Sequence, residues 1–242
     1  SGRALWWREA NPTLPWYFGA MHRLHSRNCP KLPDDSYTYA TAFNILFQPS
    51  PLVERRVDRM RDTLGLHHSD GSTSFVAIHA RVGGVVRDDV GVAGWKDPAR
   101  PTFAKTDDIA DLVRCAKEKV SDIVSSDEEV LPPIILFSDS KVFKEECSKR
   151  HAGLRYLNDS LTFHIDKSSG NHETVLRGFV DTVAEFLLLS SANCIVGSSS
   201  TFSGSAASLN TLRQGRSCYY YFRECKTLIH DFWSRTEPPF RD

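Results

Sequence analysis

Short apolar runs that alternate with helix-patterned segments constrain the fold of this chain more than any other feature. Three of the runs predict buried strands: FVAIHAR (75–81), PPIILFSDS (132–140) and NCIVGSSS (193–200). Apolar residues at helical spacing predict helices over 51–66, 106–126 and 171–192. Strands that alternate with helices are typical of α/β proteins. We therefore expect a Rossmann-like, doubly wound parallel sheet.

Shorter segments complete the expected pattern. Helices are expected at KVFKEECSKR (141–150) and SGSAASLNTLRQG (203–215), and short strands at LRYLND (154–159), TFHID (162–166) and SCYYYF (217–222). An irregular, aromatic- and proline-rich segment occupies 1–48. One domain is expected over 49–242.

Composition excludes several classes of protein. Hydrophobic residues make up 40% of the 242 residues, which is enough for a real core. The 30 basic and 30 acidic residues balance, so net charge gives no reason to expect a nucleic-acid partner. No apolar run approaches the roughly 20 residues of a membrane span. No signal-peptide pattern is visible at the start of the sequence.

The 6 cysteines form no CxxC pair and no Cys/His cluster with zinc-ligand spacing. A core of this size needs no disulfide staples, and we expect Cys194, which lies in an apolar strand, to be a buried free thiol. A glycosylation sequon, Asn158-Asp159-Ser160, would matter only in a secretory protein.

Each of the three buried strands ends in polar residues, and ligands of open parallel sheets bind beyond the carboxyl ends of strands. One crevice is therefore expected there. His79 and Arg81 lie two residues apart and face the same way on a strand. Arg81 offers a planar fork of donors for a phosphate or carboxylate. Alternatively, Arg81 is held in a salt bridge at the strand end, and His79 is satisfied within the fold.

The segment GSSSTFSGS (197–205) places hydroxyl groups and backbone N–H groups at the start of a helix, which is a favourable arrangement for an anion. It matches neither a Walker loop nor a dinucleotide fingerprint. The alternative is a serine-rich helix cap.

Acidic residues give weaker signals. Asp181 and Glu185 lie one helical turn apart, opposite an apolar stripe that includes Leu176, and would ordinarily form a solvated face. Asp139 is equally suited to cap the following helix. Asp88 and Asp89 are candidate bases if one lies within about 3 Å of an acceptor hydroxyl. No GxSxG or HExxH motif is present, and nothing specific supports a metal site.

Taken in order, AIHARVGG, ILFSDS and EFLLLSSANCIVGSSSTFSGSAASL resemble the three motif regions of the fucosyltransferase superfamily, which includes α1,2-, α1,6- and protein O-fucosyltransferases. Members carry an H-x-R motif after a strand, a strand ending in Ser-Asp, and D-x-x-L-M-S followed by N-S-T-F-S. AFNILFQPSPLVERRV (42–57) resembles the segment before H-x-R, so the likeness covers about residues 40–215. Many members read H-x-R-x-G-D, where this chain has Gly84.

The resemblance implies one half of a GT-B glycosyltransferase, with inverting transfer of fucose from GDP-fucose to a glycan or protein hydroxyl and no obligatory metal or other cofactor. Arg81 would hold the β-phosphate and His79 the nucleotide. Glu185, at a position that is normally aspartate, would contact the guanosine part. The matching phosphate-binding segment comprises Ser200, Thr201, Phe202 and Ser203.

The segment before the H-x-R strand is short for a complete GT-B enzyme, so the chain resembles the donor half alone. It is then a fragment, a processed subunit with a partner chain that supplies the N-terminal half, or a degenerate relative. The alternative function is an inactive fucosyltransferase-like domain that serves as a structural subunit, with the aromatic-rich ends as its partner surface. The resemblance also implies the lumen of the secretory pathway, in the Golgi or endoplasmic reticulum.

Overall fold

The computed structural model describes residues 43–44, 46–66, 74–82, 106–123, 131–160, 171–198, 200–214, 218–221 and 225–227. Five helices and six strands are discussed below. The helices are α3 (Pro51–Leu64), α4 (Thr106–Ile123), α5 (Lys141–Arg150), α6 (His172–Leu189) and α7 (Thr201–Gln214). The strands are β1 (Val76–Ala80), β2 (Ile134–Ser138), β3 (Leu154–Tyr156), β4 (Cys194–Gly197), β5 (Tyr219–Tyr221) and β6 (Lys226–Thr227).

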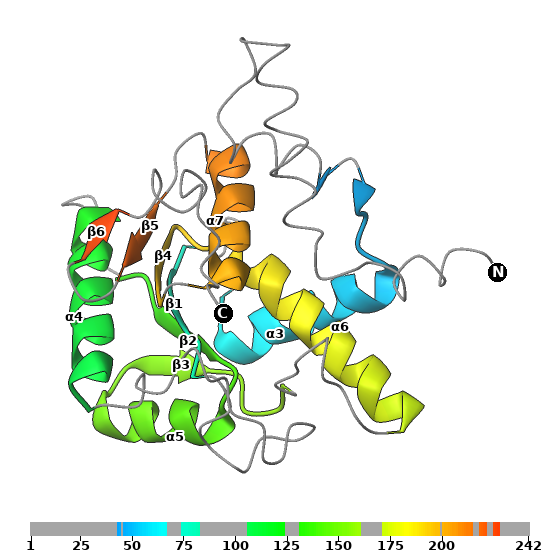
Figure 1. The fold of residues 1–242 in the computed structure, drawn as a ribbon, viewed down its shortest axis with the longest axis horizontal. Helices are drawn as coiled ribbons and strands as arrows, with labels where there is room; N and C mark the ends of the chain where they lie inside the picture. Colours follow the sequence, from blue (N-terminus) through cyan, green and yellow to red (C-terminus); the bar gives the residue numbers. More distant parts are fainter. Residues whose placement is uncertain are drawn as a thin grey trace, which may run out of the picture.

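These strands form a single sheet in the order β3-β2-β1-β4-β5-β6 (Figure 1). The first five strands of that order pair in parallel, and β6 pairs antiparallel with β5. The sheet confirms the expected Rossmann-like, doubly wound α/β fold. The segments 162–166 and 1–42 lie outside the described residues, so the strand expected at 162–166 and the proposed domain boundary stay predictions.

Helices cover both faces of the sheet, with α4 and α5 on one side and α3, α6 and α7 on the other (Figure 1). Alternation along β1 produces this division. Phe75 and Ala77 pack toward α3 and α6, whereas Val76, Ile78 and Ala80 pack toward α4. Because both faces are covered, the central strands are buried throughout.

The local signals at α3 explain its bounds. The Ser50 hydroxyl accepts a hydrogen bond from the Val53 N–H at 3.4 Å, and Pro51 occupies the first turn. Gly65 ends the helix with φ at 63°, a left-handed conformation that glycine adopts without steric cost. The helix expected over 51–66 is therefore confirmed, and Gly65 ends it after Leu64.

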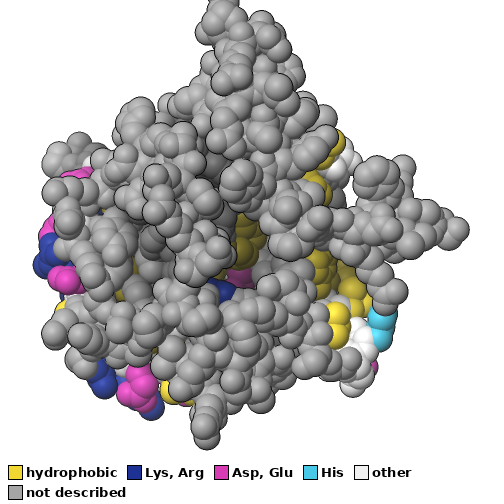
Figure 2. Space-filling view, viewed as in Figure 1, with side chains coloured by type: hydrophobic (Ala, Val, Ile, Leu, Met, Phe, Trp, Pro, Cys, Tyr) yellow, Lys and Arg dark blue, Asp and Glu magenta, His cyan; other side chains and the backbone are white. Residues whose placement is uncertain are grey.

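The expected apolar stripe of α6 was wrong at its N-terminal end. Leu176 is 46% exposed, and hydrophobic side chains reach the surface over α3 and α6 (Figure 2). The buried stripe instead runs through Val180, Ala184 and Leu188. Among the described helices, none is both long and apolar enough to cross a membrane.

The cysteine prediction was also wrong. Cys194 is bonded to Cys218, which joins the neighbouring strands β4 and β5, and Cys115 of α4 is bonded to Cys225 before β6. Strand spacing alone cannot reveal such pairs, because they depend on which strand becomes the neighbour. Cys147 is a free, buried cysteine, and burial raises the pKa of its thiol to about 12.

Candidate functional site

The candidate site lies where the strand order reverses. β2 and β3 extend the sheet on one side of β1, whereas β4 and β5 extend it on the other. His79 of β1 lies opposite Gly197 of β4, and the Ser198 N–H donates to the His79 carbonyl at 3.1 Å. The ends of β1 and β4 therefore meet at this reversal, which is where open α/β sheets bind ligands.

Arg81 is anchored just beyond β1. Its Nη1 lies 2.9 Å from Oδ2 of Asp139, which follows β2, and its backbone N–H donates to Ser198 Oγ at 3.1 Å. The other oxygen of the same carboxylate accepts a hydrogen bond from the Val82 N–H at 2.6 Å. Side-chain exposure is 21% for Arg81 and 8% for Asp139, so the guanidinium is the more accessible partner. This is the salt-bridged alternative for Arg81, at a position where part of the fork still reaches the surface.

Asp139 is not the cap of the next helix. Ser140 fills that role, because its hydroxyl accepts from the Phe143 N–H at 3.1 Å. The sequence offered two adjacent side chains that favour caps. Ser140 caps the helix, whereas Asp139 accepts a hydrogen bond from the backbone just beyond β1.

His79 joins an aromatic stack that leads from the sheet into the helical layer. Its ring lies 5.3 Å from Phe202 of α7 in a stacked arrangement, and Phe202 meets Phe186 of α6 edge-on at 5.3 Å. Phe186 in turn lies 5.6 Å from Phe43. Such aromatic contacts fix the ring planes as well as the separation of the elements.

The serine-rich segment after β4 is tied to β5. Ser203 Oγ and Tyr219 Oη lie 2.9 Å apart, and Tyr219 also donates to the Ser198 carbonyl at 3.2 Å. Ser200 is 5% exposed, and its carbonyl accepts from the Gly204 N–H at 2.9 Å. α7 begins at Thr201, whose side chain lies outside the described part. Ser200 and Ser203 thus start the helix, and the backbone N–H groups of its first turn point to the same edge as Arg81.

Gly197 is required by a close approach. A Cβ at this position would lie 3.0 Å from Cε2 of Tyr219 and 3.3 Å from Ser203 Oγ. The turn from β4 into α7 therefore packs directly on the Tyr219 ring. This contact places the start of α7 against β5.

A buried ionic network, which the sequence analysis missed, joins α3 to α6. Arg56 Nε donates to Asp181 Oδ1 at 2.6 Å, and Arg56 Nη1 lies 2.9 Å from Asp159 Oδ2. Arg56 is 8% exposed and Asp181 is 2% exposed. The solvated acidic face expected for Asp181 is therefore wrong, because α3 covers it.

Lys144 extends this polar layer. It is 1% exposed, and its Nζ donates to the Leu157 carbonyl and to Ser160 Oγ, both at 3.2 Å. Glu185 lies beside this group, and both the Lys144 ammonium and Ser160 act to lower the pKa of its carboxyl group. Part of the Glu185 side chain stays accessible, yet desolvation of its carboxyl group raises its pKa above the usual 4.5 despite both contacts.

Among the described residues, the contacts of Glu185 are thus with Lys144 and Ser160 rather than with His79 or Arg81. Its expected contact with a nucleotide stays a prediction. A signal for the network did exist in the sequence: Arg56 lies on the same helical face as Val53, Val57 and Met60. A charged residue within an apolar stripe indicates a buried partner.

Two predicted candidates cannot be placed. Asp88 and Asp89 lie outside the described residues. Within the described ranges, no group of three or more His, Cys, Asp or Glu side chains could hold a metal ion. Near the centre of the face in Figure 2, acidic, basic and apolar side chains are visible together between atoms that are not described.

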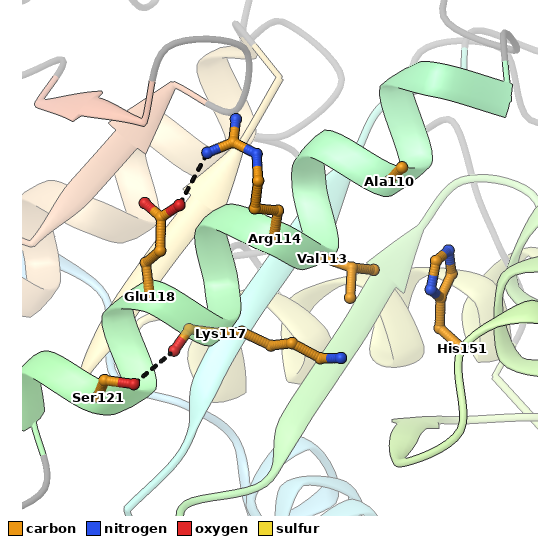
Figure 3. Close-up of a pocket in the computed structure, with 7 residues that line it drawn as sticks. All are labelled: Ala110, Val113, Arg114, Lys117, Glu118, Ser121 and His151. Atoms are coloured by element: carbon orange, nitrogen blue, oxygen red, sulfur yellow. Dashed lines mark hydrogen bonds and ion pairs between the residues drawn. The ribbon is translucent and has the colours of Figure 1, made fainter.

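A separate shallow depression lies along the outer side of α4 (Figure 3). Arg114, Lys117, Glu118 and Ser121 line it together with His151, which follows α5. Arg114 donates to Glu118 at 2.8 Å, and Ser121 donates to the Lys117 carbonyl at 3.3 Å. Arg114 is paired with Glu118 here, and no predicted site residue lines the depression, so the edge near Arg81 remains the candidate site.

Comparison with solved structures finds fucosyltransferases. NodZ α-1,6-fucosyltransferase co-crystallised with GDP matches with a TM-score of 0.38 and 12% identity, over 64% of this chain and 40% of that one. The same enzyme soaked with GDP-fucose matches with a TM-score of 0.41 and 12% identity, over 67% of this chain and 43% of that one. Fucosyltransferase NodZ from Bradyrhizobium matches with a TM-score of 0.41 and 12% identity, over 65% of this chain and 42% of that one. The chain spans about two fifths of the length of these enzymes. No protein-family model and no curated protein matches it.

Proposed function

We propose that this chain is the donor-binding part of an inverting fucosyltransferase that transfers fucose from GDP-fucose to a glycan or protein hydroxyl. One observation carries the proposal: the Arg81 backbone is bonded to Ser198, in the turn that leads from β4 into α7, at the reversal of strand order between β1 and β4. The order of the three sequence motifs supports the choice of a nucleotide sugar. No metal has a part in the proposed reaction.

The arrangement suits a leaving diphosphate. Breaking the sugar–phosphate bond places negative charge on the departing phosphate, and donors already fixed in position stabilise that charge. Asp139 holds the guanidinium of Arg81, and Ser198 holds its backbone N–H, so the side chain is positioned before a ligand arrives. The first turn of α7 adds backbone N–H groups and the positive end of the helix dipole.

The sugar becomes oxocarbenium-like as the bond breaks, which reduces the demand for a strong nucleophile. In this proposal His79, stacked on Phe202, contacts the nucleotide, while Ser200, Thr201 and Ser203 surround the phosphates through their backbone. The acceptor hydroxyl loses a proton on attack. Asp88 and Asp89 follow β1 in sequence and are the proposed bases.

The two disulfide bonds support placing this reaction in an oxidising compartment. The lumen of the Golgi or endoplasmic reticulum meets that condition. We propose this location together with the activity.

The first experiment is calorimetric titration of the chain with GDP, GDP-fucose and UDP. We expect the two guanine ligands to bind and UDP to fail. Arg81→Ala should weaken GDP binding by about ten- to hundredfold, since hydrogen bonds to charged groups contribute about 1.5–3 kcal/mol. Arg114→Ala, on the outer side of α4, is the matched control and should bind as the wild type does. A folded wild type that binds neither guanine ligand would contradict the proposed function.

A further inference from the structure

The sequon Asn158-Asp159-Ser160 is placed by the fold at a boundary between core and solvent. Leu157, which follows β3, is 2% exposed, while the next two residues are exposed. The chain therefore turns outward at Asn158. A glycan is bulky and polar, so it requires an exposed asparagine of this kind.

A second triplet in the sequence, at Asn11, can be compared with the one at Asn158. Asn11-Pro12-Thr13 has the same asparagine-to-threonine spacing, but its middle residue is proline, which prevents acceptance. Asn158 is the asparagine whose triplet meets the full requirement. The two disulfide bonds are an independent observation that points to the oxidising compartment in which sequons are used.

The third residue of the sequon behaves differently from the first. Ser160 is 6% exposed, and its hydroxyl accepts from Lys144 Nζ at 3.2 Å beneath the surface. A transferase must reach the hydroxyl of this residue as well as the asparagine. The folded chain offers the asparagine alone.

From these observations we propose that Asn158 carries an N-linked glycan, and that it is added before the segment around Ser160 folds. The donor is a lipid pyrophosphate-linked oligosaccharide. Asn158 Nδ2 forms a bond to C1 of the first sugar while the C1–O bond to the pyrophosphate breaks. The lipid pyrophosphate leaves with the electron pair, and Nδ2 loses one proton.

The test directs the full chain through the secretory pathway of a eukaryotic cell and maps its peptides before and after enzymatic deglycosylation. We expect the peptide containing Asn158 to carry a glycan that deglycosylation removes. Asn158→Gln should lack it, Asn11→Gln should keep it, and Ser160→Thr should keep it because threonine also completes a sequon. Disulfide-bonded wild type with an unmodified Asn158 would overturn the site.

Timing is tested separately with a purified oligosaccharyltransferase and its lipid-linked donor. The reduced, unfolded chain should be glycosylated, whereas the folded, disulfide-bonded chain should not. Equal modification of both forms would overturn the proposal that Ser160 is sequestered by folding. Because neither assay measures nucleotide binding, each outcome is independent of the proposed transferase function.

Discussion

At the scale of single residues, Asp139 performs two separable tasks with one carboxylate. It pairs with Arg81, and it accepts the N–H of Val82, which is fully buried. An amide oxygen could replace the second contact but not the ion pair. Two substitutions at this position therefore distinguish charge from backbone support.

Asp139→Asn should weaken GDP binding, because it removes the ion pair that fixes the Arg81 guanidinium, but it should keep most of the free energy of unfolding, because the amide oxygen still accepts from the Val82 N–H. Asp139→Ala should weaken GDP binding and lower the free energy of unfolding by about 1–3 kcal/mol, since the Val82 N–H loses its acceptor. Calorimetry and urea unfolding measure both effects. If the asparagine variant binds GDP as tightly as the wild type, the ion pair does not position Arg81.

Glu185 predicts a pH dependence of stability. Its folded-state pKa is raised above 4.5, mainly by desolvation, so the folded protein holds this proton more tightly than the unfolded chain does. The free energy of unfolding should therefore decrease as the pH rises from 4.5 through the raised pKa of Glu185. Lys144, Asp181 and Arg56 also act on this carboxyl. Their interactions with other groups remain in both proteins when the wild type is compared with a neutral variant.

Glu185→Gln should remove this decrease and make the protein more stable than the wild type at neutral pH. Urea unfolding from about pH 4 to about pH 8 measures the difference between the two proteins. Glu173→Gln, in the exposed first turn of α6, is the control and should follow the wild-type curve. If the free energies of unfolding of the wild type and Glu185→Gln change in parallel with pH, desolvation does not raise the pKa of Glu185.

Sequence patterns predicted which residues lie at the ends of strands, but they predicted less well which residues from other elements contact them. His79 and Arg81 could be found because an apolar strand that ends in polar residues is a local signal. Their partners come from other parts of the chain: Asp139 follows β2, and Phe202, which stacks on His79, belongs to α7. Such partners follow from the pairing order of the sheet, which local periodicity does not contain.

At the scale of elements, the contact of α3 with α6 rests on a buried ion pair as well as on apolar packing. The side chains of Arg56 and Asp181 are 10% and 3% exposed. Removing one partner from such a pair leaves the other charge buried and uncompensated. Helix periodicity predicted both helices correctly, yet it assigned Asp181 to solvent because it could not show that α3 packs on that face.

Arg56→Ala should lower the free energy of unfolding by about 3–5 kcal/mol, because Asp181 stays buried without its partner. The double variant Arg56→Met with Asp181→Leu should recover most of that loss. The exposed pair of Arg114 and Glu118 is the control, and Arg114→Ala should leave the free energy of unfolding close to the wild-type value. Chemical denaturation of the four proteins measures these values. A loss for Arg56→Ala as small as the control would mean that the buried pair contributes little.

At the scale of the whole molecule, two disulfide bonds close loops of very different length. Cys115 and Cys225 are 110 residues apart, whereas Cys194 and Cys218 are 24 apart. Loop-closure entropy assigns about 5 kcal/mol to the longer loop and about 3 kcal/mol to the shorter one. A core of this size was expected to need no disulfide bonds. Core size alone, however, does not include the entropy of the unfolded chain, which a disulfide bond lowers.

Replacing Cys115 and Cys225 with alanine should therefore lower the melting temperature more than replacing Cys194 and Cys218. Differential scanning calorimetry compares the two double variants with Cys147→Ala, which removes a buried sulfur without breaking a bond. Equal losses in the two double variants would show that strain or local packing outweighs loop length.

The central place of β1 has a consequence for the order of assembly. It is the first described strand to be synthesised, yet β4, one of its two partners, begins 118 residues later at the register pair of Val76 and Cys194. A nascent chain therefore carries His79 and Arg81 long before the strand that completes their surroundings leaves the ribosome. Contacts between distant parts of a sequence slow folding. The proposed binding edge should be among the last parts of the protein to form, and chains interrupted before β4 should hold both residues without a site.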